Sequence, residues 1–260
     1  MMPRAEILKD IVADLRMAAS FVTILPVASS KPAPDGAVAR ATWALPIAGL
    51  LVGLAGAFIY KVAIRVGLSP SLAALLALAT TALITGALHE DGLADTADGL
   101  GGGRTRERKL EIMRDSRIGT YGTCALILSF GLRWSALAVI ANPLAVALAL
   151  CAAHAAARAG VPAFMSLVPP ARPDGLSASA GAPPGRSVAV AFALGTLALV
   201  LMLGPAKALA GLFLLSLAGL LLARLAIRQI GGQTGDILGA FEQIGEILIL
   251  LVAASFPTGG

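Results

Sequence analysis

The sequence predicts an all-α fold, a polytopic membrane helix bundle with about seven transmembrane helices and an N-terminal amphipathic helix. Of its 260 residues, 57% are hydrophobic and only 13% are charged, whereas a soluble domain has about 25% charged residues. The 29 glycines are typical of helices that pack closely in lipid. The net charge of +5 fits basic cytoplasmic loops in so apolar a chain, and we expect a lipid bilayer and no nucleic acid as partner.

The first predicted element is a helix over residues 5–28. Its acidic residues share one helical face and its apolar residues another: Glu6, Asp10 and Asp14 against Ile7, Ile11 and Leu15. The apolar run 17–28 contains Pro26 and is too short for an ordinary span of about 20 residues. This pattern predicts an amphipathic helix that lies in the interface or is partly re-entrant.

Seven later segments are apolar enough to cross a membrane. They are 41–60, 68–88, 119–140, 143–168, 187–203, 206–223 and 237–254. Between the fourth and the fifth, residues 169–187 hold five prolines and three glycines and are predicted to form a loop. We treat residues 1–260 as one membrane-embedded domain.

The basic residues predict the orientation. Fifteen lysines and arginines fall on the side of residues 1–40, and three fall on the other side: Lys61, Arg65 and Lys207. Such an excess marks the cytoplasmic side. The acidic segment after the second span, the proline-rich loop and the turn 231–236 all share that side, as one site requires.

Residues 89–122 contain the most informative polar sequence. Asp91, Asp95 and Asp98 stand at i, i+4 and i+7, so on a helix they share one face. Three such carboxylates repel one another unless a cation lies between them, and Mg²⁺ prefers oxygen ligands and bridges to substrate phosphates. The pattern predicts catalytic, metal-binding aspartates. The alternative is a solvated loop whose acids pair with Arg104, Arg106 and Arg108.

The basic part of the same region ends at a span entry. Arg114 and Arg117 are candidates for phosphate contact, because the guanidinium fork matches phosphate oxygens. Asp115 between them could be a further metal ligand or could orient the arginines. The glycines 101–103 are either a flexible connection or a phosphate cradle.

Residues 230–246 form the second motif region. The turn Gly231-Gly232-Gln233-Thr234-Gly235-Asp236 is followed by Glu242 and Glu246, which face one way on a helix. Carboxylates inside a span are unfavourable and usually mark function. The alternative is that they pair with the intramembrane Arg133 or Arg158. His154 is interpreted as a packed polar residue, and His89 either supports the aspartates or forms a helix-end hydrogen bond.

These three motifs resemble the cobalamin synthase family, also called adenosylcobinamide-GDP ribazoletransferase. The resemblance rests on residues 89–99, on 112–122 and on 231–236 with Glu246, and it covers essentially the whole chain. The chain departs from the family pattern at residues 21–28, which lack an arginine, and at 174–176.

The resemblance implies the reaction. A hydroxyl of α-ribazole, or of its 5′-phosphate, attacks the cobinamide-linked phosphate of adenosylcobinamide-GDP, and GMP leaves. It also implies Mg²⁺, the bacterial inner membrane and an active site that faces the cytoplasm. A homo-oligomer and a complex of the late corrinoid pathway stay open.

We assign candidate roles accordingly. Asp91, Asp95 and Asp98 would hold Mg²⁺, and Asp115 or Asp236 would act as base. Substrate or phosphate contacts are expected from six residues: Gly99, Arg114, Arg117, Arg158, Thr234 and Glu246.

Two other functions compete. A CDP-alcohol phosphotransferase making phospholipid also uses aspartates and Mg²⁺, but its aspartate spacing is longer. A cation transporter would show repeated halves and broken helices at the midplane, whereas no repeat is found here.

Overall fold

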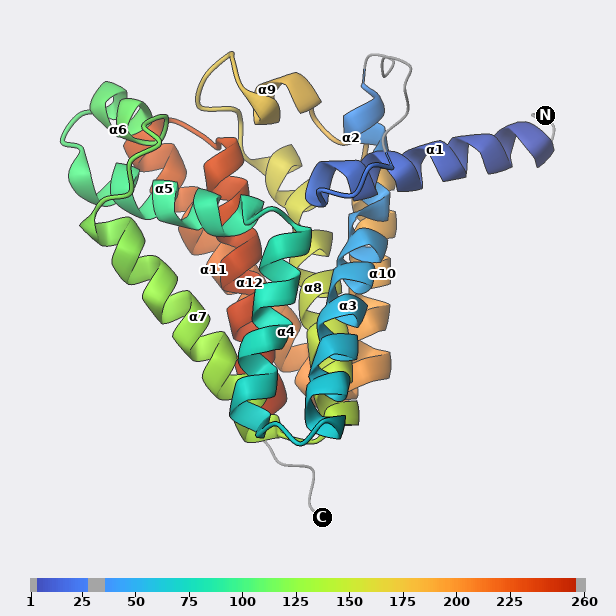
Figure 1. Cartoon of the computed structure of the whole chain (residues 1–260). Coiled ribbons are helices and arrows are strands. Elements are labelled where there is room, and N and C mark those ends of the chain that lie inside the picture. Colours follow the sequence, from blue (N-terminus) through green and yellow to red (C-terminus); the bar gives the residue numbers. More distant parts are fainter. Residues whose placement is uncertain (1–3, 28–35, 256–260) are drawn as a thin grey trace.

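The computed structural model describes residues 4–27 and 36–255, and its regular elements there are helices that form a membrane-type bundle (Figure 1). The α-helices are α1 (Arg4–Val22), α2 (Ala37–Ala41), α3 (Leu45–Arg65), α4 (Pro70–Ile84), α5 (Leu88–Gly102), α6 (Arg106–Ile112), α7 (Thr120–Ile140), α8 (Pro143–Leu167), α9 (Leu176–Ala180), α10 (Gly185–Leu203), α11 (Pro205–Ile230) and α12 (Gly235–Ala254). A 3₁₀ turn, η1 (Thr42–Ala44), joins α2 to α3.

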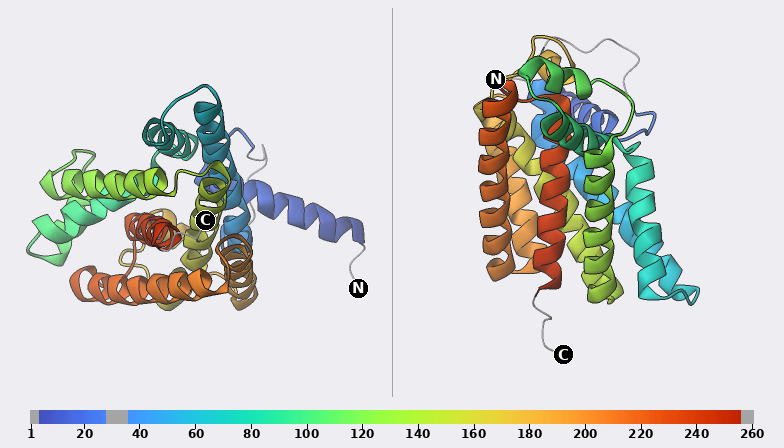
Figure 2. Two further views of the ribbon diagram at one scale, coloured as in Figure 1. Left: turned by 90° about the horizontal axis from the view of Figure 1, so that it is seen from below. Right: turned by 90° about the vertical axis from the view of Figure 1, so that its left-hand side faces the viewer.

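Six helical segments of the described chain are long and apolar enough to cross a membrane. They are Ala37–Arg65, Thr120–Ile140, Pro143–Leu167, Gly185–Leu203, Pro205–Ile230 and Gly235–Ala254. The prediction of about seven spans is met if α4 and α5, which meet at 88°, count together as one broken span. The spanning helices run side by side, with α6 and α9 at one end (Figures 1 and 2).

The predicted continuous helix 68–88 is the main correction. Helix α4 ends at Ile84, and α5 begins at Leu88 after a sharp turn. Gly86 and Ala87 both have positive φ, 61° and 54°, which ends α4 and redirects the chain. The acidic motif therefore lies on a separate helix that crosses the end of the bundle (Figure 1).

The N-terminal amphipathic helix is confirmed as α1, which projects sideways from the bundle (Figure 1). It ends at Val22, and the predicted end at residue 28 lies outside the described residues. Asp14 fixes α1 to the bundle: it accepts hydrogen bonds from Arg40 Nε (3.1 Å) and Trp43 Nε1 (2.9 Å).

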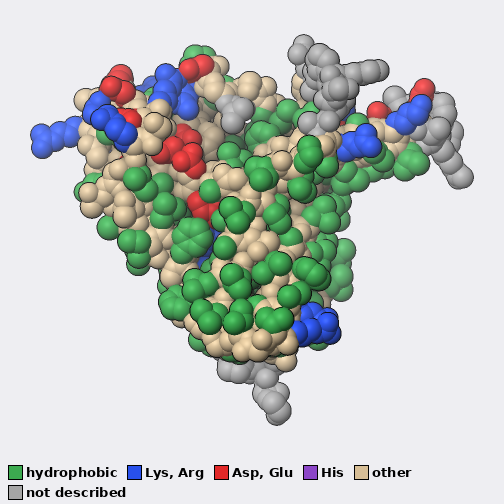
Figure 3. All heavy atoms as spheres, viewed as in Figure 1, with side chains coloured by type: hydrophobic (Ala, Val, Ile, Leu, Met, Phe, Trp, Pro, Cys, Tyr) green, Lys and Arg blue, Asp and Glu red, His purple; other side chains and the backbone are tan. Residues whose placement is uncertain are grey.

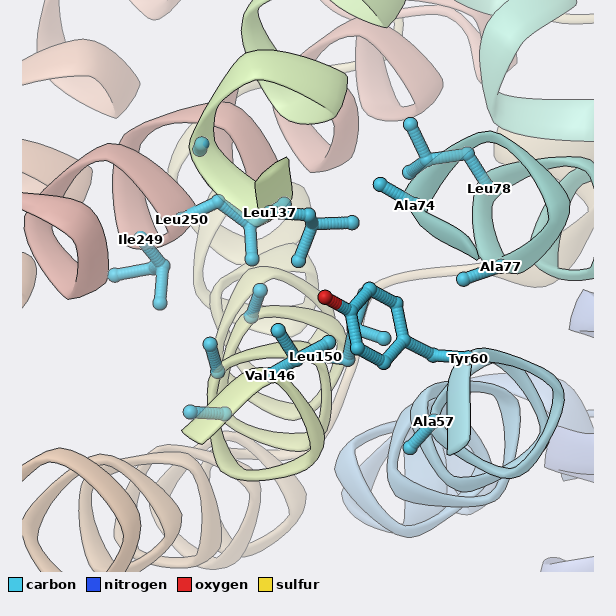
Figure 4. Close-up of a cluster of buried hydrophobic side chains, with 14 of the residues drawn as sticks. Ala57, Tyr60, Ala74, Ala77, Leu78, Leu137, Val146, Leu150, Ile249 and Leu250 are labelled. Atoms are coloured by element: carbon cyan, nitrogen blue, oxygen red, sulfur yellow. The ribbon is translucent and has the colours of Figure 1, made fainter. Parts of the chain in front are cut away.

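Small residues bring the central helices close together. An added Cβ at Gly53 of α3 would lie 2.8 Å from Cys151 Cα of α8, so only glycine permits this contact. Below it, a core of alanine and leucine side chains surrounds Tyr60 (Figure 4). The Tyr60 hydroxyl donates to the Ala141 carbonyl at 3.0 Å, which satisfies the buried hydroxyl.

The predicted loop 169–187 contains the short helix α9, and α10 begins at its end, at Gly185. It pairs with the turn before α12, because the Ala171 N–H donates to Gln233 O and the Gln233 N–H donates to Pro169 O, both at 2.8 Å. An added Cβ at Gly232 would collide with Pro169 O. The loop is therefore tied to the second motif region.

Candidate active site

The site forms where α5 crosses α12. An added Cβ at Gly92 of α5 would lie 2.9 Å from the carbonyl oxygen of Asp236, and an added Cβ at Gly239 would lie 3.3 Å from Gly92 Cα. Because neither residue has a side chain, the two helices touch there. This contact brings Asp91 and Asp95, on α5, to the N-terminus of α12, where Asp236 stands.

The electrostatics of Asp95 show that the carboxylates are crowded. Burial, followed by the charges of Asp91, Asp236 and Asp98, raises the pKa of Asp95 from 3.8 to about 7. A cation among these groups would relieve that repulsion. Figure 3 shows acidic side chains gathered at this end of the molecule beside basic ones. Asp91, Asp95 and Asp98 thus lie on one helix, as predicted, and Asp236 of α12 is close enough to Asp95 to affect its charge.

Asp98 differs from its two neighbours. It is buried, and its Oδ2 accepts a hydrogen bond from the Gly119 N–H (2.7 Å) while its Oδ1 accepts one from the Gly122 N–H (2.9 Å). These donors belong to the first turn of α7, whose free N–H groups need acceptors. Asp98 therefore caps α7 from α5, a contact that positions the helix, and its predicted role in metal binding stays a prediction.

The predicted phosphate-binding arginines lie on the surface in ion pairs. Arg114 Nη2 is 2.5 Å from Asp174 Oδ2, so the segment after α6 contacts the proline-rich loop. Arg117 donates to Asp115 at 2.6 Å, and its hydrogen bonds lower the pKa of Asp115 to about 2. A carboxylate with so low a pKa is a weak base. Of the two predicted bases, Asp236 is thus better matched than Asp115.

The loop supplies a basic residue that the sequence analysis did not select. Arg172 Nη2 is 3.9 Å from Asp236 Oδ2, and its buried Nη1 has no hydrogen-bond partner among the described residues. Arg106 holds this part of the loop by donating to Ala171 O at 2.7 Å. A free, buried guanidinium nitrogen beside the carboxylates is suited to a phosphate oxygen.

Thr234 and Gly99 support the site through the backbone. Thr234 caps α12, because its Oγ1 accepts from the Ile237 N–H at 3.3 Å, and its hydroxyl donates to Asp236 Oδ2 at 3.0 Å. An added Cβ at Gly99 would lie 2.5 Å from the Met113 side chain, so Gly99 lets α6 pack on α5. Their predicted contacts with substrate stay predictions.

A buried ion network lies beneath the carboxylates. Arg133 of α7 contacts Glu246 (3.0 Å) and Glu90 (3.3 Å). Arg158 of α8 contacts Glu246 (2.9 Å) and Glu242 (2.5 Å). Glu242 and Glu246 of α12 thus pair with intramembrane arginines. The sequence analysis gave this pairing as the alternative to a direct functional role.

The two histidines also belong to this network. His154 Nδ1 contacts Glu246, so it is a packed polar residue as expected, and His89 Nδ1 lies 3.4 Å from Arg158 Nη2. His154, Glu242 and Glu246 are close enough together to hold a metal ion. The Arg158 guanidinium already contacts both glutamates, however, and supplies the positive charge there. We therefore interpret this cluster as an ion network.

The comparisons with known proteins agree with these motifs. The family described as cobalamin-5-phosphate synthase matches residues 14–254. The chain belongs to the cobalamin-5-phosphate synthase family. A relative from Bradyrhizobium diazoefficiens, called adenosylcobinamide-GDP ribazoletransferase, is 83% identical over 259 residues, which is 100% of each chain.

More distant members of the family carry the same name. A relative from Mesorhizobium japonicum is 50% identical over 95% of this chain and 94% of its own length. One from Azorhizobium caulinodans is 46% identical over 93% of this chain and 95% of its own length. No solved structure matches the chain. The family assignment therefore rests on sequence, and the site described above is a candidate site for this family.

Proposed function

We propose that this chain is an adenosylcobinamide-GDP ribazoletransferase that acts late in cobalamin synthesis. The observation that supports this most strongly is the 83% identity over the full chain to a relative of that name. The geometry agrees, because a diphosphate substrate needs clustered carboxylates for a cation and basic groups for phosphate oxygens. The clustered carboxylates are those of Asp91, Asp95 and Asp236. One basic group is the guanidinium of Arg172.

In the proposed reaction, a ribazole hydroxyl oxygen forms a bond to the phosphorus that carries cobinamide. The bond from that phosphorus to the bridging oxygen breaks, and GMP leaves with this oxygen and its electron pair. The hydroxyl proton passes to a carboxylate, for which Asp236 is our candidate. Arg172, with its unpartnered Nη1, would hold a phosphate oxygen in place.

The residues fit a Mg²⁺ ion. Asp91 is exposed, and Asp95 and Asp236 are partly buried, so all three can offer oxygen ligands to a cation that also binds substrate. Their atoms do not form a closed group of the kind found at His154, Glu242 and Glu246. Mg²⁺ needs no such cage, since it usually keeps several waters and binds substrate phosphates. Once bound, it would neutralise charge that develops on the leaving phosphate.

The proposed orientation places the site toward the cytoplasm of the bacterial inner membrane. The excess of basic residues at the α6 end of the bundle supports it. A cysteine introduced at Arg104, in a Cys124→Ser background, should react in intact spheroplasts only with a membrane-permeant maleimide. Reaction with an impermeant maleimide would refute this orientation.

The test of function uses purified protein in detergent or liposomes. It receives adenosylcobinamide-GDP, α-ribazole 5′-phosphate and Mg²⁺, and GMP and the cobalamin product are measured with and without EDTA. We expect both products in equal amounts, and neither in EDTA. Folded protein that forms neither product would refute the proposal, and release of CMP from a CDP-alcohol would favour the phospholipid synthase.

A further inference from the structure

A cavity of about 420 Å³ lies beside the carboxylates, between α1 and the bundle. We call it the α1 cavity. Its wall on the side of α1, α2 and the start of α3 is mostly apolar and includes Met17, Ala18 and Leu45. The charged residues that line it come from α5, α8 and α12, and they include Asp91 and Asp236. One cavity thus joins an apolar wall to the candidate catalytic carboxylates.

A buried arginine also lines the α1 cavity. Arg158 is 1% exposed, and its guanidinium is held by Glu242 and Glu246. Together with Asp91 and Asp236 it gives the cavity a polar lining on α5, α8 and α12.

The volume and the lining of the cavity indicate which part of the two substrates it can hold. The volume is near the lower end of the 300–1,000 Å³ found for small-molecule sites, so it fits a nucleoside but not a corrin ring with its side chains. Guanine presents several hydrogen-bond donors and acceptors, which the apolar wall would leave unpaired. The base of α-ribazole, dimethylbenzimidazole, is planar, uncharged and largely apolar, and it carries a ribose with hydroxyl groups.

We propose that the α1 cavity binds the acceptor, with its benzimidazole base against α1 and its ribose toward Asp91 and Asp236. This inference rests on the proposed function. In this arrangement Asp236 can take the proton of the attacking hydroxyl. Helix α1 then determines which bases the enzyme accepts.

The test narrows the cavity at Ala18. Ala18→Leu adds bulk to the apolar wall, whereas Ala13→Leu makes the same change at an exposed position of α1 outside the cavity. We expect Ala18→Leu to raise the KM for α-ribazole 5′-phosphate at least about tenfold, the scale set by misfit of a methylene in an apolar pocket. The KM for adenosylcobinamide-GDP should stay within about twofold, and Ala13→Leu should resemble the wild type.

Base selectivity gives a readout that a general loss of structure would not change. The nucleotide of unsubstituted benzimidazole lacks both methyl groups, so Ala18→Leu should impair its use less than that of the dimethyl acceptor. If Ala18→Leu does not fold, Met17→Ala decides the matter, since it enlarges the cavity. That variant should accept a nucleotide with a larger, naphthimidazole base better, relative to the dimethyl acceptor, than the wild type does.

The other outcomes are distinct. A rise in the KM for the donor alone would place adenosylcobinamide-GDP in the cavity and overturn the inference. Unchanged constants and selectivity in the folded variants would also overturn it. Wild-type protein that releases no GMP would instead refute the proposed function, so the two failures can be told apart.

Discussion

Arg133 connects three helices and provides the most direct test of the buried network. Its side chain is 1% exposed and pairs with Glu90 of α5 and Glu246 of α12 at 3.3 and 3.0 Å. Glu246 also contacts Arg158, whereas Glu90 forms its ion pair with Arg133 alone among the residues that the structure describes. Arg133→Met keeps much of the apolar stem but leaves Glu90 as a buried carboxylate without a cation. Loss of one partner from a buried pair costs about 3–5 kcal/mol.

The penalty should depend on the charge of Glu90. Glu90→Gln removes that charge, so the double variant should be more stable than the sum of the single effects predicts, with a coupling energy of about 1 kcal/mol or more. Arg108→Met is the matched control. Arg108 pairs with Glu111 at 2.8 Å on the surface, where an ion pair contributes about 0–1 kcal/mol.

Unfolding can be followed through a native thiol. Cys151 is buried in the bundle and Cys124 is exposed, so a Cys124→Ser background leaves one thiol that reacts on unfolding. The free energy of unfolding is obtained by titrating detergent micelles with SDS. A loss below about 1 kcal/mol for Arg133→Met, or strictly additive effects of the two substitutions, would refute the network as a source of stability.

The site itself gives three more expected outcomes. Asp91→Asn should lower kcat at least about 100-fold in the GMP assay, with little loss of stability because Asp91 is exposed. Gly92→Ala should lower the free energy of unfolding by about 1–3 kcal/mol through its clash with Asp236, whereas Gly131→Ala, whose Cβ meets nothing within 4 Å, should not. The pKa of Asp95 is raised from 3.8 to about 7, so its charged form opposes folding. Without Mg²⁺, stability measured by SDS titration should therefore fall from about pH 4 to about pH 7, and Asp95→Asn should reduce that slope.

The helices and the acidic face could be predicted because both depend on local pattern. Uncharged runs of about 20 residues indicate spans whatever their partners. The spacing of Asp91, Asp95 and Asp98 places them on one face of any helix. The sequence analysis also expected the turn 231–236 to share their side of the membrane, and the structure places Asp236 beside them.

The bend before α5 had one weak local signal. Gly86 adopts φ = 61° and the Ala87 N–H donates to Ala82 O at 2.8 Å, which is the pattern by which a glycine ends a helix, whereas Ala87 itself ordinarily favours helix. Tertiary contacts outweigh this preference. The Ile24 N–H donates to Ile84 O at 2.8 Å, and an added Cβ at Gly86 would lie 2.7 Å from Ile24 Cγ2. A segment 60 residues away in the chain thus occupies the space at the end of α4.

The roles of individual polar residues also depended on distant partners. Asp98 matches the pattern of a metal ligand, but its oxygens accept hydrogen bonds from backbone groups 21 and 24 residues later. Arg172 was counted only as a basic loop residue, because its proximity to Asp236 arises from the pairing of the loop with the turn. The sequence offered one indication of its role: Arg172 lies in a loop on the same side of the membrane as the two acidic motifs.

The buried network explains how a helix that lies across the bundle can hold a precise site. Glu90 and Asp91 are neighbours on α5, yet Glu90 is buried against Arg133 and Asp91 is exposed at the α1 cavity. The ion pairs therefore fix the rotation of α5 about its own axis, and this rotation decides where the aspartates point. Apolar residues in place of the network could be equally stable, but they would select one rotation less strictly. In the proposed reaction, a small misplacement of the carboxylates would lower the rate. We therefore expect Arg133→Met combined with Glu90→Gln to regain stability while kcat stays low, and full recovery of kcat would refute a positioning role for the network.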